Sequence, residues 1–252
     1  MALLAAENLC KSFGGLEILS NISFSAEPGE KVAIIGPNGA GKSTFFNVLG
    51  GQLAATKGRI FLGGRDVTKL SPDRRLHLGL ARSYQINNLF FTLPLVSNMM
   101  LALYGAERSH FQMLRSLYGR RDFCDAAQES LELMDLWDRR FEPLTSLSYG
   151  DQRLVEIALA MASKPKVVLL DEPTAGLPTA EAVNFGAKIR RLAGDATLVF
   201  CAHDMDLVFN LADRISVLCF GEIIAEGDPA AIRCNPKVQE IYLGCEDPFG
   251  DA

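Results

Sequence analysis

Short apolar runs alternate with amphipathic segments through the second half of the chain. The runs are rich in Val, Leu, Ile and Phe, which is typical of strands buried on both faces of a parallel sheet. Regular alternation of such strands with helices predicts an α/β fold with a mainly parallel sheet and right-handed crossovers. The predicted order is strand 166–171, helix 179–192, strand 196–201, helix 205–211 and strand 213–219.

The first part of the chain has another pattern, in which apolar and polar residues alternate over short stretches. Residues 3–35 predict antiparallel strands that end in the turn Pro28-Gly29-Glu30, and residues 58–67 predict one more short strand. Ser71-Pro72-Asp73 combines a capping residue with a proline, which favours the start of a helix. We therefore expect an N-terminal antiparallel β-subdomain.

A helical segment interrupts these two sheet-forming parts. Between Leu93 and Trp137 apolar residues recur at a period near 3.6, with charged residues between them. We expect a helical subdomain at 86–147, inserted into a single domain whose core comprises residues 1–85 and 148–252. The residues that define the period are Val96, Met99, Met100 and Leu103, followed by Ala126, Ser130, Leu133 and Met134.

The C-terminal segment predicts a hairpin and short helices. Two strands between Arg214 and Glu226 are expected to pair about a turn at Phe220-Gly221. Residues 229–243 follow as short terminal helices.

Composition narrows the class of protein. The 252 residues include 25 basic and 30 acidic side chains, a net charge of -5, so there is no basic footprint for nucleic acid or anionic lipid. The apolar runs fall far short of the ~20 residues that span a bilayer. The first residues lack a basic region and reach Glu7 early, so we expect a first strand rather than a signal sequence. The six cysteines form no C-x-x-C pair, which favours reduced thiols.

A glycine-rich loop joins the predicted strand 31–35 to a predicted helix at 42–49. It reads Gly36, Pro37, Asn38, Gly39, Ala40, Gly41, Lys42, Ser43, Thr44. The glycines permit positive φ and close approach of the backbone to phosphate oxygens, and the loop N–H groups converge at a helix N-terminus. Lys42 can contact β- and γ-phosphates and Ser43 can ligate Mg²⁺. The alternative is a glycine-rich turn before an ordinary helix.

Four further motifs accompany the loop. Asp171 and Glu172 end an apolar strand, and His203 follows another in Ala202-His203-Asp204. Gln85 ends Ser83-Tyr84-Gln85, and Leu147-Ser148-Tyr149-Gly150-Asp151-Gln152-Arg153 leads into an amphipathic helix. Singly, these motifs are also compatible with a solvated strand end, a strand-end histidine, a loop glutamine and an N-capped helix.

Together with the glycine-rich loop, these motifs resemble the nucleotide-binding subunit of an ABC transporter over essentially the whole chain. The resemblance implies the P-loop NTPase fold of ABC ATPases, and two subunits that bind ATP head to tail. In such a pair Ser148, Gly150 and Gln152 of one subunit would contact the ATP held by the loop of the other. A hydroxyl, a bare backbone N–H and a helix N-terminus all suit a phosphate.

The resemblance also implies individual roles for the remaining motifs. Asp171 would hold Mg²⁺ through its water shell, Glu172 would be the catalytic base, and His203 would link the γ-phosphate to Glu172. Gln85 would contact Mg²⁺ and relay the nucleotide state to the helical subdomain. Phe13 would stack beneath adenine, with a core phenylalanine as the alternative.

One segment departs from the family pattern. The chain reads Ala175-Gly176-Leu177-Pro178-Thr179 where the family usually has Asp or Asn in place of Pro178. Proline lacks both the N–H and a hydrogen-bonding side chain, so coupling of the two ATP sites through this segment is in doubt.

Five sequence segments are similar to the corresponding segments in the ATPase subunits of branched-chain and hydrophobic amino-acid importers. They are Leu147-Ser148-Tyr149-Gly150, Arg82-Ser83-Tyr84-Gln85, the insertion around 108–121, His203-Asp204-Met205 and Ile241-Tyr242-Leu243-Gly244. Urea or amide importers, lipopolysaccharide exporters, a soluble ABC ATPase and a P-loop kinase or GTPase stay as alternatives.

The resemblance thus implies an ATP hydrolase with ATP and Mg²⁺ as ligands. We expect as partners a second ATPase subunit, either identical or a close paralogue, membrane permease subunits and, indirectly, a substrate-binding protein, but no nucleic acid. The expected location is peripheral, on the cytoplasmic side of the membrane.

Overall fold

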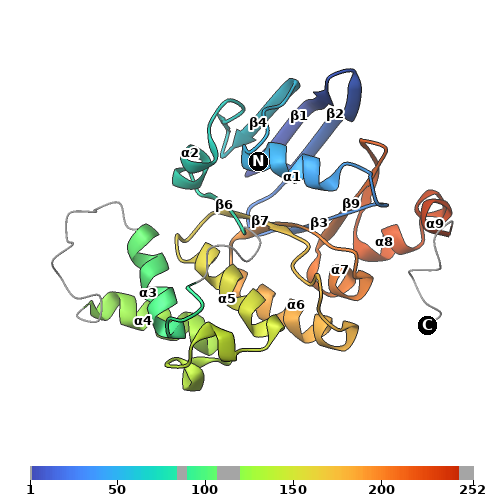
Figure 1. Ribbon diagram of the computed structural model, residues 1–252. Coiled ribbons are helices and arrows are strands. Elements are labelled where there is room, and N and C mark those ends of the chain that lie inside the picture. The colour runs from blue at the N-terminus through green and yellow to red at the C-terminus, as the bar shows by residue number, and fades with distance from the viewer. Residues whose placement is uncertain (1, 84–89, 107–119, 244–252) are drawn as a thin grey trace.

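The computed structural model describes residues 2–83, 90–106 and 120–243. Among these residues the strands form two sheets (Figure 1). The smaller sheet is antiparallel, with the order β2-β1-β4-β5. Its strands are β1 (Leu4–Phe13), β2 (Leu16–Ala26), β4 (Lys57–Leu62) and β5 (Arg65–Asp66).

The central sheet has the order β10-β9-β3-β8-β7-β6. Its neighbours pair in parallel except for the edge strand β10, which pairs antiparallel with β9. The predictions of an α/β fold, a mainly parallel sheet and a C-terminal hairpin are therefore confirmed. The strands are β3 (Lys31–Ile35), β6 (Leu80–Arg82), β7 (Val167–Asp171), β8 (Thr197–Cys201), β9 (Arg214–Cys219) and β10 (Glu222–Gly227).

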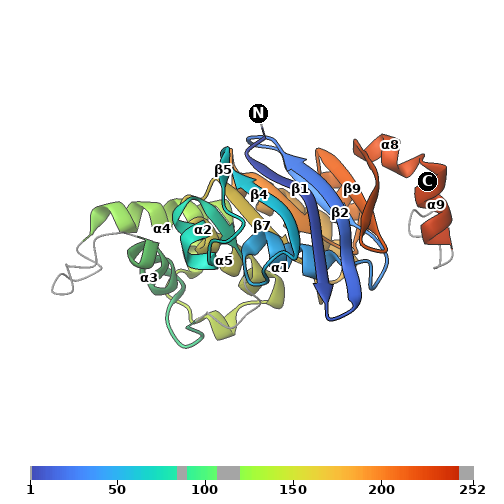
Figure 2. The same cartoon turned by 90° about the horizontal axis from the view of Figure 1, so that it is seen from above.

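Helices cover both faces of the central sheet. In Figure 1 α1 lies between the two sheets, α5, α6 and α7 lie beneath the central sheet, and α3 and α4 extend to one side. Figure 2 shows the same lateral extension from above. The helices are α1 (Lys42–Gly50), α2 (Pro72–His77), α3 (Leu95–Ala106), α4 (Arg121–Leu133), α5 (Tyr149–Met161), α6 (Thr179–Ala193), α7 (Met205–Leu211), α8 (Pro229–Arg233) and α9 (Pro236–Leu243), with 3₁₀ turns at Trp137–Arg139 and Leu144–Ser146.

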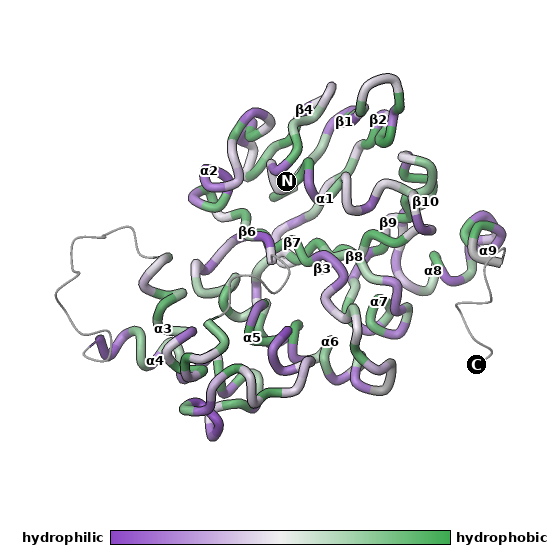
Figure 3. Tube along the Cα trace, in the orientation of Figure 1, coloured by the Kyte–Doolittle hydropathy of each residue, from purple (hydrophilic) through white to green (hydrophobic). Residues whose placement is uncertain are grey.

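The apolar core has two parts, one on each face of the central sheet. One lies between the antiparallel sheet, α1 and the upper face, and includes Phe24, Phe45 and Phe46. The other continues without a break from α3 and α4 through α5 and α6 to the lower face. Figure 3 shows the strands of the central sheet as the most continuous apolar stretch. The subdomain boundaries at 86 and 147 therefore stay predictions, because the core crosses from the helical segment into α5.

Three details of the predicted elements are wrong. Residues 31–35 do not continue the antiparallel strands, since β3 pairs in parallel with β8 and β9. Residues 58–67 form two strands, β4 and β5, joined at Gly63-Gly64. The short strand β6, which the sequence pattern did not show, pairs with β7 at the sheet edge. Three residues are too few to display a period, so pairing with β7 defines the strand.

The predicted buried face of α4 is also displaced. Its buried residues are Phe123, Ala127 and Leu131 rather than Ala126, Ser130 and Leu133, which are half-buried, whereas Met134, the C-cap residue, is buried. The aromatic ring of Phe123 sets this face, because burying it removes more apolar surface from water than burying Ala126 would. On α3 the predicted Val96, Met99 and Met100 are buried.

Within the described residues, no helix has the length and apolar character needed to span a bilayer. Of the described cysteines, Cys201 and Cys219 are buried free thiols, Cys10 and Cys124 are partly buried, and Cys234 is exposed.

A buried arginine joins α2 to the end of α1. The Arg75 side chain is 1% exposed and donates hydrogen bonds to the carbonyl oxygens of Val48 (2.8 Å), Leu49 (2.5 Å), Thr68 (2.9 Å) and Leu70 (3.1 Å). Burial lowers the pKa of Arg75 to about 10. The guanidinium thus satisfies carbonyls at the negative, C-terminal end of α1, the end opposite the glycine-rich loop.

We expect Arg75→Met to lower the free energy of unfolding by about 3 kcal/mol, because it leaves several buried carbonyls without donors. The neighbouring Arg74 is exposed. Arg74→Met is therefore a matched control, with an expected change within about 0.5 kcal/mol. Urea unfolding of both variants measures the difference. Equal midpoints would show that Arg75 is not needed to anchor α1.

Candidate active site

The glycine-rich loop connects β3 to α1, so the N-terminal N–H groups of α1 open toward the loop. Gly41 is the N-cap residue with a φ of 103°, and an added Cβ would lie 2.9 Å from Leu19 Cδ2. A Cβ on Gly36 would lie 1.9 Å from the Leu218 carbonyl oxygen. Packing against β2 and β9 therefore requires these two glycines. Gly39, at φ 80°, has open space around it and is left free for a ligand.

Lys42 is held at the centre of this loop. Its side chain is buried, and Nζ donates hydrogen bonds to the carbonyl oxygens of Gly36 (2.6 Å) and Pro37 (3.0 Å). Burial lowers the pKa of Lys42, while the nearby charges of Glu172 and Asp171 act against that shift. The ammonium group is thus held in place before a ligand binds. The two carbonyls carry no net charge, so an anion in the loop would provide the negative charge that pairs with Lys42.

Glu172 and His203 face the same cleft. Glu172 follows β7 with a φ of 47°, and its N–H donates to the Cys201 carbonyl (3.0 Å). Its Oε1 lies 3.0 Å from His203 Nε2, and both side chains are partly exposed. A left-handed glutamate is uncommon and costly, and such positions concentrate at functional sites. The cleft, of about 230 Å³, is lined by Ile18, Asn38, Gly39, Ala40, Gly41, Lys42, Ser43, Thr44, Glu172 and His203.

Asp171 is held beside this cleft by its neighbours. Its Oδ2 lies 3.0 Å from Arg82 Nη2, and its Oδ1 accepts from Cys201 Sγ at 2.8 Å. Arg82 also donates to Asn47 Oδ1 and Gln52 Oε1. Burial and then the Asp171 charge raise the pKa of the Cys201 thiol. The sequence indicates no partner for Arg82, because nothing in a linear pattern points to a residue 89 positions away.

The oxygen donors near the loop fit a magnesium ion. The Ser43 side chain is exposed in the cleft, and carboxylate and hydroxyl oxygens are the hard ligands that Mg²⁺ prefers. Both oxygens of Asp171 already have protein partners. This arrangement suits contact through the ion's water shell better than direct ligation. Gln85, the third predicted ligand, lies outside the described residues.

Phe13 lies at the end of β1, next to the hairpin turn. Its side chain is 49% exposed, with Lys11 Nζ 4.7 Å from the ring centroid. The ring is therefore accessible to a ligand and is not a core residue. Ile18, which the sequence interpretation did not include, lines the cleft.

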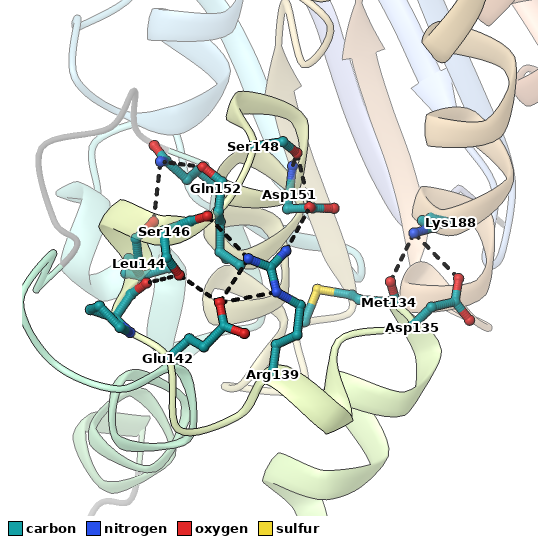
Figure 4. Close-up of polar contacts among 12 residues, drawn as sticks. Met134, Asp135, Arg139, Glu142, Leu144, Ser146, Ser148, Asp151, Gln152 and Lys188 are labelled. Carbon is teal, nitrogen blue, oxygen red and sulfur yellow. Dashed lines mark hydrogen bonds and ion pairs between the residues drawn. The ribbon is translucent and has the colours of Figure 1, made fainter.

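The segment 147–153, which we call the signature segment, lies outside this cleft. Among the described residues, the cleft lining does not include Ser148, Gly150 or Gln152. Ser148 caps α5, and Gly150 is buried where an added Cβ would lie 3.2 Å from Leu177 Cδ2. Gln152 Nε2 donates to the carbonyls of Leu144 (3.2 Å) and Leu147 (3.1 Å). Gln152 thus supports the preceding loop, as Figure 4 shows.

Pro178 is the N-cap residue of α6. It forms no side-chain capping bond, and its carbonyl accepts from the Glu181 N–H at 2.9 Å. The segment is therefore well formed without the acid found in the family, and the effect on coupling between two sites stays a prediction.

Comparison with known protein families gives two matches. A family described as ABC transporter matches residues 19–175, which include the loop, the signature segment and β7. A family described as branched-chain amino acid ATP-binding cassette transporter matches residues 222–244.

Individual proteins resemble the chain over nearly its full length. The high-affinity branched-chain amino acid transport ATP-binding protein LivG of Salmonella typhimurium is 36% identical, with 96% of this chain and 98% of LivG covered. The ADP conformation of MJ1267, an ATP-binding cassette of an ABC transporter, is 32% identical with a TM-score of 0.81, covering 97% of this chain and 99% of that one. A dimeric post-hydrolysis state of the cassette MJ0796, bound to ADP and Pi, is 26% identical with a TM-score of 0.72, covering 90% and 98%.

Proposed function

The chain belongs to the ABC transporter family, and from that membership we propose that it is the ATP-binding and ATP-hydrolysing subunit of a transporter for branched-chain or other hydrophobic amino acids. It would work with separate permease subunits, on the cytoplasmic face of the membrane. The observation that carries the proposal is the placement of Lys42, Glu172 and His203 around one cleft, with Glu172 and His203 3.0 Å apart.

These residues support a direct route for ATP hydrolysis. The Lys42 ammonium and the loop N–H groups bind the β- and γ-phosphates. Glu172 accepts a proton from a water molecule while the oxygen of that water attacks the γ-phosphorus. The bond between the γ-phosphorus and the oxygen of the leaving ADP then breaks, giving ADP and phosphate. His203, held by Glu172, contacts the γ-phosphate. Ser43, Gln85 and, through water, Asp171 are the residues that would hold Mg²⁺, and the bound ion would supply positive charge against the phosphates.

A second copy, or a close paralogue, completes each site. Ser148 and the N-terminus of α5 are separated from the cleft in a single chain. Head-to-tail association would bring the Ser148 segment of one subunit over the γ-phosphate bound by the other. The cassette MJ0796 has a dimeric structure in a post-hydrolysis state bound to ADP and Pi, which supports association in pairs.

A groove offers a contact for a permease. It lies between α2, β6, α3 and α5, has a volume of about 300 Å³, and is mainly apolar with Leu76 at its rim. Arg82, the partner of Asp171, also lines it. A permease segment bound in this groove would contact Arg82 of β6, which pairs with Asp171, the carboxylate expected to face Mg²⁺. Permease conformation and nucleotide state could therefore influence each other.

The proposed cargo rests on the relatives. LivG is named for branched-chain amino acid transport, and the match at 222–244 is to a family of the same description. A substrate-binding protein would deliver the amino acid to the permease. A related importer of urea or amides, or an exporter, is the alternative.

Co-expression with candidate permease subunits tests the proposal. We expect the chain to co-purify with them, and its ATPase activity in liposomes to rise several-fold when a leucine-loaded substrate-binding protein is added. A urea-loaded or empty binding protein is the control. Stimulation by urea alone would assign another cargo, and an ATPase that never associates with a membrane subunit would favour a soluble ABC ATPase.

A further inference from the structure

A polar network lies directly behind the signature segment (Figure 4). Arg139 Nε and Nη2 donate to Glu142 Oε2 at 3.1 and 2.8 Å, and Nη2 also donates to the Ser146 carbonyl at 3.0 Å. Ser146 Oγ donates to the same Glu142 oxygen at 2.7 Å. These bonds orient the guanidinium, and the third nitrogen, Nη1, lies 3.7 Å from Asp151 Oδ2. Asp151 is in the first turn of α5.

The Ser148 hydroxyl both donates a hydrogen bond to Asp151 and accepts one from it. Its oxygen accepts from the Asp151 N–H at 3.2 Å, which is the N-cap bond of α5. Its single proton is donated to Asp151 Oδ2 at 2.9 Å. A phosphate oxygen can only accept hydrogen bonds, so Ser148 can bind one only if that proton turns away from Asp151.

The charge of Asp151 also opposes a phosphate at this position. A carboxylate in the first turn of α5 would face the triphosphate that the Ser148 segment of the proposed pair contacts. Arg139 is the cation placed against it. The positive charge of the guanidinium offsets the repulsion between Asp151 and the phosphate. It also weakens the hydrogen bond that Asp151 Oδ2 accepts from the Ser148 hydroxyl.

We propose that Arg139 is a positioning residue of the composite ATP site, which neutralises Asp151 so that Ser148 can turn its hydroxyl proton to a phosphate of ATP held by a second subunit. The inference rests on the proposed function. Arg139 acts through Asp151 and need not touch the nucleotide. The planar guanidinium suits this role, because Nε and Nη2 donate hydrogen bonds to Glu142 while Nη1 faces Asp151.

The decisive measurement is a double-mutant cycle of Arg139→Gln and Asp151→Asn. Arg139→Gln should lower kcat about tenfold, because one uncompensated charge faces the phosphate, and leave nucleotide affinity of the isolated subunit within about twofold. Asp151→Asn keeps an acceptor for Ser148 but removes the charge. The double variant should therefore recover most of the activity lost in Arg139→Gln, and Arg139→Lys should fall between wild type and Arg139→Gln.

Controls separate this role from a structural one. Asp135 accepts from Arg191 at 3.2 Å and also pairs with Lys188 at 3.3 Å, and Figure 4 draws the Asp135–Lys188 pair. Arg191→Gln should leave kcat unchanged. Urea unfolding of each variant reports any loss of stability. An unaltered kcat in Arg139→Gln, or a double variant with the product of both single losses, would overturn the inference.

The wild-type protein separates this inference from the proposed function. If wild type neither hydrolyses ATP nor dimerises with Mg-ATP, the proposed function fails. If wild type does both and Arg139→Gln matches it, only the role of Arg139 fails.

Discussion

Glu172→Gln is expected to slow ATP hydrolysis by ~10²- to 10⁴-fold, the usual effect of losing a general base, while ATP still binds. Glutamine has the same size, and its amide oxygen can accept from His203 Nε2 in place of the carboxylate oxygen that lies 3.0 Å away. The Lys42 loop is untouched. ATP should therefore bind and close the proposed pair of subunits without being consumed.

Gel filtration with Mg-ATP and a steady-state ATPase assay measure both effects. We expect the variant to elute as a stable dimer and wild type to return to monomer as ATP is consumed. Glu129→Gln removes an exposed carboxylate on α4 and serves as the matched control, with wild-type turnover and elution. A strictly monomeric, fully active Glu172→Gln protein would refute the composite site.

Lys42→Ala should reduce ATP affinity by about 10- to 150-fold. The change removes the charge that faces the β- and γ-phosphates, and a hydrogen bond to a charged group contributes about 1.5–3 kcal/mol. It also frees the carbonyls of Gly36 and Pro37 that Nζ now contacts, which loosens the loop. Titration with a fluorescent ATP analogue gives the Kd directly.

Lys31 provides a control for the loss of a buried lysine outside the glycine-rich loop. It lies at the other end of β3, is buried, and donates to the carbonyls of Gly29, Gly194 and Ala196. Lys31→Ala should lower the free energy of unfolding but keep the wild-type Kd for the analogue. If Lys42→Ala binds about as tightly as wild type, the loop is not the phosphate site.

Much of the fold followed from periodicity alone. The runs that became β7, β8 and β9 were visible because strands buried on both faces are continuously apolar, and the helices between them show a period near 3.6. Strand β6 and the buried face of α4 were not correctly predicted. Each depends on a neighbour, β7 in one case and the packing of Phe123 in the other.

The candidate site divides in the same way. Lys42, Asp171, Glu172 and His203 were identified because their motifs are local, and the structure places them at adjacent loop and strand ends of one sheet. Arg82 beside Asp171 and Arg139 beside Asp151 could not be identified, since each pair joins segments whose separation in sequence carries no signal.

The sequence by itself determined the fold class, the family and the residue types that can bind phosphate, because short motifs and hydrophobic periods depend on neighbouring positions. Tertiary structure decided which charges meet. The structure shows the Arg82–Asp171 ion pair, the hydrogen bonds from Gln152 to the carbonyls of the preceding loop, and the hydrogen bond from the Ser148 hydroxyl to Asp151. The Arg82–Asp171 pair arises when segments 89 residues apart pack together, and the energies of all these contacts depend on distances of a few ångströms that no linear pattern contains.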